Sequence, residues 1–498
     1  MNEGLLLMVE QYHGEPIFNK QTYFMLQKID RKKFLQLSLL APLSIAAKPL
    51  AFLNIAASNK MYLGENVIYY KAGEAEYEKL RKGFNKRIDK LPAVIALCMN
   101  TSGVAEAVNY AAKNKLPIAV KSGGHCMEGF SCNNGGMVIN LSAMKNIEWI
   151  NNETVKLNPA CTLSEIYDVL LPKKKIIPGG SCAGVGIGGL ALGGGYGLLA
   201  RKLGLTCDSL QSVTMVDGKG NIVSSDIHPD LLWACRGGNN GNFGVVTSLS
   251  FKLHTAPSFL KSYRFRAYKL TKERATIILQ KWFELSAALP VDCFSAFVLN
   301  GKTIYILLTN VGKETSAVQK VIDELKLLTD KNSNAPAQPL AKALKNYYGR
   351  PGPMYFKNAS AGLYKNFGEI ESFIDKALDV VLATPGMIYQ VNTLGGNIQN
   401  NDFEKGSAFP HRAYPFFSEL QTYWENPSQQ KKLLERFQQV QEIFMENGIK
   451  AQYRNYPDIN FSNWPQMYYG NNYKRLQEIK ARFDPDNLFR FEQSVQKK

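Results

Sequence analysis

Two glycine-rich segments contain the side chains whose types and spacing are best suited to chemistry. Residues 121–136 include the run SGGH, which ends at His125, and residues 178–197 contain ten glycines around Cys182. Because glycine lacks a β-carbon, such loops let several backbone N–H groups converge on an anion and let the main chain approach a flat ring closely. Either loop alone could equally be a tight turn. Together they predict a site for one large, phosphate-bearing cofactor.

The second segment also contains a G-x-G-x-x-G pattern from Gly184 to Gly189, which raises the alternative of a Rossmann dinucleotide site. Asp208 follows about twenty residues later, where an acidic ribose ligand would belong. That motif needs a strand leading directly into the first glycine and a helix starting at the last. Here a run beginning at Pro178 interrupts the approach, and three consecutive glycines follow. The context therefore argues against a nicotinamide cofactor.

The composition is that of a soluble globular protein. The chain has 498 residues, 45% hydrophobic and 20% charged, and a formal net charge of +17. This length predicts two domains. The basic residues are spread along the chain without an arginine-rich arm or an RNA-binding motif, so nucleic acid is not an expected partner. The eight cysteines include no C-x-x-C pair, which favours neither a disulfide framework nor a metal site.

Residues 1–59 are typical of an export signal and linker rather than of a fold. A basic run at residues 31–33 precedes an apolar run, residues 34–47, that is too short to span a bilayer, so no stable membrane insertion is expected. The basic run resembles the twin-arginine pattern with lysine in place of the second arginine. We expect a periplasmic or secreted protein. The alternative is an amphipathic helix packed on the body of a cytoplasmic protein.

From residue 60 the pattern is mixed α/β, and its texture changes after His254. The first part predicts a helix over 101–115 capped by Thr101 or Ser102, a strand over 117–121, and a capping box formed by Thr162 and Glu165. A hairpin is expected to turn at residues 217–218. The second part predicts helices near 272–289, 313–328 and 427–445, a hairpin at 300–301, and strands in MIYQVNTLGG and AYPFFSELQTYW.

The motifs and their order resemble the FAD-linked oxidases of the berberine-bridge-enzyme and oligosaccharide-oxidase group, within the vanillyl-alcohol-oxidase superfamily. They include PIAVKSGGHCMEGFS, GGSCAGVGIGGLALGGGYGLLARKLG, CRGGNNGNFGVV, FPHR and RNYPDIN. The resemblance implies an α+β, two-domain fold of the PCMH type. It places an FAD-binding domain at 60–257, a substrate-binding domain of antiparallel sheet backed by helices at 258–453, and a segment returning to the FAD domain at 454–498.

The resemblance also implies a flavin bound twice, through His125 to the 8α-methyl group and through Cys182 to carbon C6. Backbone N–H dipoles that lower the pKa of the Cys182 thiol would help that attachment. One position departs from the family, because Leu190 stands where a histidine is usual. Further cofactor contacts are expected from Ser122, Gly123, Gly124, Val185, Gly186, Gly189, Gly194, Tyr196, Gly197, Val246 and Asn487.

Val185 matches the small residue that leaves oxygen a path to the flavin in this family, so an oxidase producing hydrogen peroxide is expected. Two alternatives remain open at this point. One is a dehydrogenase that passes electrons to another acceptor. The other is a flavin-binding protein without turnover. This alternative stays open because Leu190 replaces the histidine that is usual in the family.

Hydride removal from an alcohol carbon of a sugar or secondary metabolite also needs a base for the hydroxyl proton. The resemblance implies Tyr456, whose pKa would have to be lowered by nearby positive charge or bypassed by concerted transfer. Alternation in the strand FFSELQTYW places Glu419 on one face, where burial would raise its pKa and suit it to base catalysis. Gln390 and Asn392 match substrate-contacting positions of sugar-oxidising members.

Overall fold

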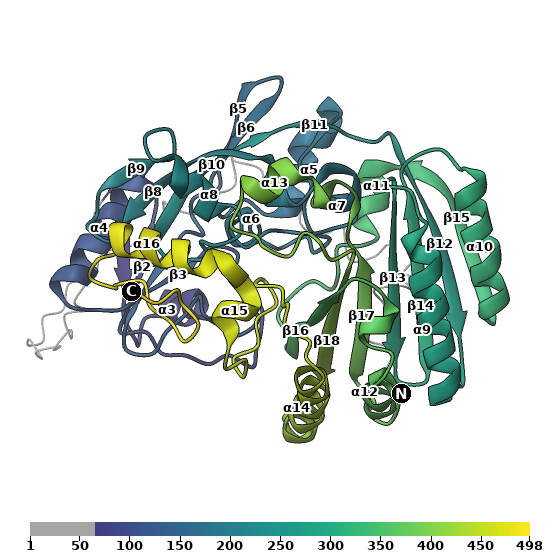
Figure 1. Ribbon diagram of the computed structural model, residues 1–498. Coiled ribbons are helices and arrows are strands. Elements are labelled where there is room, and N and C mark those ends of the chain that lie inside the picture. The colour runs from purple at the N-terminus through teal and green to yellow at the C-terminus, as the bar shows by residue number, and fades with distance from the viewer. Residues whose placement is uncertain (1–64) are drawn as a thin grey trace, which may run out of the picture. The chain divides into compact units, whose positions relative to one another are not determined.

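The computed structural model describes residues 65–498, and their strands divide among four sheets (Figure 1). The expected export segment, residues 1–59, lies outside the described residues. The fold is α+β, as the sequence predicts. The strands of the first two sheets come from residues 67–252, and those of the largest sheet come from residues 259–424. The exact domain boundaries stay a prediction.

The first sheet has four strands in the order β1-β2-β4-β3. Strands β2, β4 and β3 are parallel, and β1 pairs with β2 in the antiparallel sense. Helix α4 packs its apolar stripe on this sheet, and Asn100, not Thr101 or Ser102, caps it by accepting from Gly103 N–H. The strands and helices here are β1 (Val67–Tyr70), α3 (Ala75–Arg81), β2 (Val94–Cys98), α4 (Thr101–Lys113), β3 (Ile118–Lys121) and β4 (Met137–Asn140).

The second sheet is antiparallel, with the order β5-β6-β10-β8-β9. The predicted hairpin turn at residues 217–218 joins β8 and β9, and the predicted capping box begins helix α5 at Thr162. The elements of this region are β5 (Ile147–Asn151), β6 (Thr154–Leu157), α5 (Leu163–Leu170), β7 (Lys175–Ile176), α6 (Ile187–Leu192), α7 (Ala200–Leu203), β8 (Leu210–Asp217), β9 (Ile222–Ser224), α8 (Pro229–Cys235), β10 (Gly244–Lys252) and β11 (His254–Thr255). Strands β7 and β11 pair as a separate two-stranded sheet.

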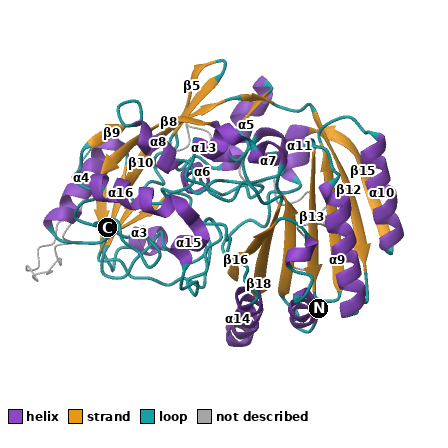
Figure 2. Ribbon diagram, in the orientation of Figure 1, coloured by secondary structure: helices purple, strands orange, loops and turns teal. Residues whose placement is uncertain are grey.

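The largest sheet is antiparallel, with the order β15-β12-β14-β13-β17-β18-β16 (Figure 2). Its elements are β12 (Phe259–Ala267), α9 (Lys272–Ala287), β13 (Cys293–Asn300), β14 (Thr303–Asn310), α10 (Ser316–Leu328), β15 (Lys331–Pro339), α11 (Leu340–Lys345), β16 (Tyr355–Tyr364), α12 (Ile374–Leu382), β17 (Met387–Thr393), α13 (Asn401–Lys405), β18 (Phe416–Trp424) and α14 (Gln430–Glu446). Helices α9, α10, α12 and α14 share one apolar core with this sheet.

Period-two alternation assigns the other face of the same strands to polar side chains. Tyr389 and Leu420 belong to the core shared with the helices, whereas their neighbours Gln390 and Glu419 do not. In register, Glu419 lies opposite Gln390 on β17 and opposite Ser360 on β16. Three adjacent strands therefore present their polar residues side by side.

The C-terminal segment returns to the first sheet. It contains α15 (Trp464–Tyr469) and α16 (Tyr473–Phe483) and is the yellow ribbon near β2, β3 and α4 in Figure 1. Ile118 N–H of β3 donates to Leu488 C=O at 2.8 Å. The buried Lys480 ammonium donates to Asn242 C=O at 2.7 Å and to Phe489 C=O at 2.6 Å. These bonds fix the end of the chain against the part that contains the first glycine loop.

Candidate active site

The structure brings the two glycine-rich loops into direct backbone contact. A β-carbon at Gly123 would lie only 2.4 Å from Gly186 N, and one at Gly186 would lie 2.6 Å from Ser122 Oγ. Gly186 also bridges to Thr162, so the second loop is held from both sides. Only glycine permits this approach at either position, which explains the bare backbone of both segments.

His125 lies where the two loops meet. A β-carbon at Gly184 would be 3.2 Å from His125 Nε2, and the imidazole stacks on Phe84 with ring centroids 4.3 Å apart. Burial lowers the pKa of His125 to about 4, because removal from water disfavours the charged form. The ring is therefore neutral near pH 7, which leaves one nitrogen with a free lone pair.

Cys182 is half-buried at the start of the second loop. Burial raises the pKa of its thiol, and a hydrogen bond from the Gly184 backbone opposes that shift in part. The net direction is opposite to the lowered pKa expected from the sequence, because desolvation outweighs the single backbone dipole. All eight cysteines, which fall within residues 65–498, are free thiols.

A carboxylate forms the centre of the polar face of the large sheet. Glu419 Oε1 accepts from Asn392 Nδ2 at 3.1 Å and from the Tyr196 hydroxyl at 3.2 Å, and Oε2 accepts from Asn358 Nδ2 at 3.0 Å. The Glu419 residue is 3% exposed. Tyr196 lies between Gly195 and Gly197 in the second loop, so this bond joins the glycine-rich region to the sheet.

The same row of hydrogen bonds continues outward along the strands. Gln390 Nε2 donates to Asn392 Oδ1 at 2.8 Å, and Gln421 Nε2 donates to Gln390 Oε1 at 3.1 Å. The Tyr423 hydroxyl then donates to Gln421 Oε1 at 2.8 Å. Burial raises the pKa of Tyr423, and electrostatic interactions with Glu419 and with Cys182 raise it further.

Tyr456 packs beside this cluster. Its ring stacks on Phe417 at 5.6 Å and meets the Tyr196 ring edge to face at 6.2 Å. Its backbone is fixed, because Ser360 N–H of β16 donates to Tyr456 C=O at 2.8 Å. The structure thus brings together three residues that the sequence predicted separately, in the region of residues 196, 419 and 456.

Electrostatics divide the roles of these groups. Burial raises the pKa of Glu419, and its hydrogen-bond donors oppose that shift. Burial and the Glu419 charge hold the pKa of both Tyr196 and Tyr456 well above the ordinary value. Of the two routes considered for Tyr456, a pKa lowered by positive charge does not agree with the structure, because the charge that acts on it most is the Glu419 carboxylate. Both phenols therefore keep their protons near neutral pH, and the Tyr196 hydroxyl donates to Glu419. Concerted proton transfer stays a prediction.

The remaining predicted cofactor residues lie along the two loops, in strand β10 or at the return of the chain. Gly124 and Gly194 have φ of +71° and +118°, and Gly197 lies against the Gly179 carbonyl. Gly189 has open space on its β-carbon side, and Val185 is half-buried between Cys182 and Gly186. Val246 is buried in strand β10. Whether these residues contact a cofactor stays a prediction.

The sequence analysis did not identify Asn358 as a residue of the site. It considered Asp208 only as the ribose ligand of a Rossmann site. The signal for Asn358 was an alternation of polar residues in YFKNASAGLY, which the surrounding apolar residues obscured. Asp208 forms a buried ion pair with Arg412, whose Nη2 and Nη1 donate at 2.5 and 3.0 Å. Both carboxylate oxygens are thus occupied by a guanidinium, which removes the acidic ribose ligand that a Rossmann site would need.

The residues present fit an FAD molecule. The glycine contacts leave backbone N–H groups in two adjoining loops, as an anion and a flat ring require. Two amide oxygens near these loops and the returning chain, Asn240 Oδ1 and Asn487 Oδ1, are buried without a hydrogen-bond partner. Buried polar atoms normally have partners, so both are available to a ligand. Asn487, with φ of +53°, is one of the predicted cofactor residues.

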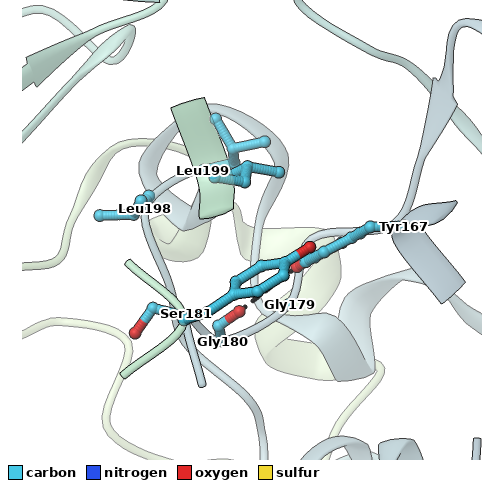
Figure 3. Close-up of a pocket in the computed structure, with 8 residues that line it drawn as sticks. Tyr167, Gly179, Gly180, Ser181, Leu198 and Leu199 are labelled. Atoms are coloured by element: carbon cyan, nitrogen blue, oxygen red, sulfur yellow. Dashed lines mark hydrogen bonds between the residues drawn. The ribbon is translucent and has the colours of Figure 1, made fainter. Parts of the chain in front are cut away.

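A small pocket adjoins the second loop (Figure 3). It encloses about 10 Å³, which is room for about one water molecule. The Tyr167 hydroxyl points across it and donates to Gly180 C=O at 3.4 Å. The pocket is too small for a cofactor or a substrate. The tyrosine supports the turn that precedes Cys182.

Residues 65–498 contain neither a metal site nor a membrane-spanning helix. No three histidine, cysteine, aspartate or glutamate side chains in this part of the chain are grouped as metal ligands. None of its helices combines the length and the apolar character needed to cross a membrane.

Comparison with known proteins identifies the family. An FAD binding domain model matches residues 92–226, and a berberine and berberine-like model matches residues 452–496. The chain is 30% identical over 444 residues to YgaK, an FAD-linked oxidoreductase of Bacillus subtilis, covering 85% of this chain and 95% of that protein. It is 27% identical over 452 residues to the chitooligosaccharide oxidase of Gibberella zeae, covering 86% and 92%.

Solved structures agree with this assignment. A chitooligosaccharide oxidase superposes with a TM-score of 0.77 at 25% identity, covering 87% of this chain and 97% of that one. Aclacinomycin oxidoreductase superposes with a TM-score of 0.79 at 26% identity, covering 87% and 100%. A BBE-like protein of Physcomitrella patens has a TM-score of 0.80 at 22% identity, with coverage of 87% and 97%, and shows the same fold. The chain is therefore an FAD-linked oxidoreductase that belongs to the berberine-bridge-enzyme-like family.

Proposed function

We propose that this protein is an FAD-dependent oxidase that removes a hydride from an alcohol carbon of a sugar or a hydroxylated secondary metabolite and passes the electrons to oxygen. The observation that carries the proposal is the buried Glu419 carboxylate, bonded to Tyr196 and adjoining Tyr456, beside the two joined glycine loops. This arrangement unites a proton acceptor with a cradle that fits FAD.

His125 and Cys182 would hold the cofactor covalently, through the neutral imidazole and the thiol. Bound FAD would supply the acceptor for the hydride. The contact between His125 and Gly184 supports this assignment, because it brings the imidazole next to the loop that contains the thiol. A thiol must lose its proton to become a nucleophile, and the raised pKa of Cys182 makes that step the slower of the two attachments.

Glu419 would receive the proton of the substrate hydroxyl. The Tyr196 hydroxyl donates to Glu419 Oε1 at 3.2 Å, and the Tyr456 ring contacts the Tyr196 ring. A phenol can pass a proton along such a bond by giving up its own proton to the carboxylate as it accepts one from the substrate. The substrate O–H bond breaks, the carboxyl O–H bond forms, and no free phenolate is needed.

The amide row supports a substrate with several hydroxyl groups. Gln390, Asn392 and Gln421 offer donors and acceptors side by side on one face of the sheet. Amide groups in this arrangement can bond neighbouring hydroxyls of one ring. Two relatives named for such substrates, a chitooligosaccharide oxidase and a xylooligosaccharide oxidase, share the fold. Oxygen as the electron acceptor is expected from the small Val185 beside Cys182.

Anaerobic mixing of the flavin-loaded protein with a panel of sugars and aromatic alcohols tests the proposal. Loss of the flavin absorbance with one substrate class, followed by recovery and peroxide release on admitting air, is the expected result. Mass analysis of the His125 and Cys182 peptides after denaturation counts the covalent bonds. A protein that bleaches but recovers only with an artificial acceptor is a dehydrogenase. One that keeps its colour with every substrate contradicts turnover itself.

A further inference from the structure

Four buried or nearly buried charged side chains form a cluster that the chemistry above does not use. Lys357 Nζ on β16 donates to Glu128 Oε1 and to Asp458 Oδ1, each at 2.7 Å. The second oxygen of Glu128 accepts from Arg87 Nη2 at 2.7 Å. The side chains of Lys357, Glu128 and Asp458 are 5%, 2% and 0% exposed. Two cations and two carboxylates neutralise one another away from water.

The members of this cluster come from segments that contain the site residues. Three of them lie within three positions of a site residue along the chain: Glu128 of His125, Asp458 of Tyr456, and Lys357 of Asn358, the donor to Glu419. One ammonium therefore joins the first glycine loop, the Tyr456 segment and strand β16. These three segments are far apart in the sequence.

Additional bonds make the Asp458 corner rigid. Asp458 Oδ2 accepts from Gln441 Nε2 of α14 at 3.1 Å, and the same amide donates to Ser360 C=O at 3.0 Å. Asp458 N–H donates to the Tyr468 hydroxyl at 3.0 Å. Loss of the Lys357 ammonium would remove the direct bond between β16 and the Asp458 carboxylate, and would leave the Gln441 bridge and the bond from Ser360 N–H to Tyr456 C=O as ties to β16.

A buried ion cluster of this kind is a poor means of gaining stability. Apolar residues of similar volume are often as stabilising, because charges lose their hydration when buried. Charge-assisted hydrogen bonds are, however, strongly directional. They fix the relative positions of segments more closely than apolar packing does.

We propose that Lys357 is a positioning residue for the active site: its ammonium holds the His125 loop and the Tyr456 segment at fixed places against strand β16. The catalytic consequence rests on the proposed function of Tyr456 and Glu419. The structural consequence does not, because it concerns only how three segments of this chain are held.

Hydrogen exchange of Lys357→Met tests the structural consequence without any substrate. We expect exchange about tenfold faster or more in peptides covering both 125–130 and 453–460. Lys480→Met is the matched control, because Lys480 also donates to a buried aspartate, Asp484, at 2.7 Å. It should accelerate exchange near 480–489 and leave the other two segments protected. If Lys357→Met loosens only β16 and α14, the proposal is overturned.

A second variant, with a smaller change, tests the proposal even if the Lys357→Met protein does not fold. Glu128→Gln keeps the bond between Lys357 and Asp458 and removes only the charge on the first loop. We expect faster exchange at 125–130, unchanged exchange at 453–460, and a smaller fraction of flavin attached to the His125 peptide by mass. Unchanged exchange and attachment in Glu128→Gln would contradict a positioning role for the cluster.

Flavin reduction measures the catalytic consequence. In the FAD-loaded Lys357→Met protein, we expect the reduction rate at saturating substrate to fall about 100-fold while KM changes by less than about threefold. A purely stabilising residue would instead lower the amount of folded protein and leave the rate per bound flavin unchanged. If the wild-type protein reduces with no substrate, the oxidase proposal fails, but the exchange result still decides the role of Lys357.

Discussion

Replacement of Glu419 by glutamine removes the proton acceptor while keeping a side chain of nearly the same shape, so it distinguishes a role in proton transfer from a role in stability. The glutamine oxygen can keep the donors Tyr196 and Asn392, while its NH₂ group takes the place of Oε2 and faces Asn358. At present Asn358 donates from Nδ2, and its Oδ1 is buried without a partner. A 180° turn of the Asn358 amide would present that oxygen to the new donor. The new donor is then satisfied, and Asn358 Nδ2 is left at the buried position where Oδ1 now has no partner.

The expected magnitudes follow from this geometry. Glu419→Gln should lower the free energy of unfolding by about 1–3 kcal/mol, because one buried donor, Asn358 Nδ2, loses its acceptor when the amide turns. Glu419→Leu leaves three donors without an acceptor, each costing about 1–3 kcal/mol, and should be markedly less stable. The rate of flavin reduction in Glu419→Gln should fall about 10²- to 10⁴-fold, the usual contribution of a general base, or about 3–5 kcal/mol of activation free energy.

The pH dependence provides a second, independent signature. The folded-state pKa of Glu419 is raised above its ordinary value of 4.5, so the folded protein holds this proton more tightly than the unfolded chain does. Stability contributed by Glu419 is therefore complete below about pH 4.5 and is lost as the pH rises through the folded-state pKa. Activity changes in the opposite direction, because only the carboxylate accepts a proton. Glu419→Gln should abolish both effects.

Anaerobic stopped-flow reduction and urea unfolding, each followed across pH, measure these quantities on the same protein. The reasoning is refuted if Glu419→Gln reduces its flavin at the wild-type rate with the same acidic limb. In that case Tyr456 would accept the proton without the carboxylate. A loss of stability in Glu419→Gln as large as that in Glu419→Leu would refute the proposed turn of the Asn358 amide instead.

Three further outcomes are expected. Since the pKa of His125 is about 4, attachment of FAD to its imidazole should proceed at a constant rate between about pH 6 and 8. The masses of the His125 peptide, followed against time, measure this rate. A rate that rises with pH through a pKa near 6.5 would contradict a neutral imidazole as the nucleophile. Gly123→Ala places a β-carbon 2.4 Å from Gly186 N, so we expect folded protein without bound flavin. The absorbance of the purified protein measures its flavin content. A full flavin content would show that the two loops can separate. Arg412→Met leaves the Asp208 carboxylate buried without its ion-pair partner and should lower the free energy of unfolding by about 3–5 kcal/mol, as measured with urea. Adding Asp208→Asn to this variant should restore part of that free energy. If it restores none, the unpaired charge is not the cause.

The sequence by itself determined the local features of this protein. Glycine content marked both loops, because only glycine allows backbones to approach so closely. Alternation along FFSELQTYW placed Glu419 and Gln421 on one face, since successive side chains of a strand point to opposite sides. The capping box at Thr162 and the hairpin at residues 217–218 followed from equally short patterns. Each of these depends on residues only a few positions apart.

Only the tertiary structure decided which of these features meet. Asn358 and Glu419 are 61 positions apart, Tyr196 and Glu419 are 223 apart, and the ion pair that occupies Asp208 spans 204 positions. Such pairs depend on the strand order of the large sheet and on how the glycine loop packs against it. The pKa of Tyr456 shows the same limit. Its sign depends on the charge that folding brings nearest, and that charge is a carboxylate, a partner that no local pattern around Tyr456 reveals.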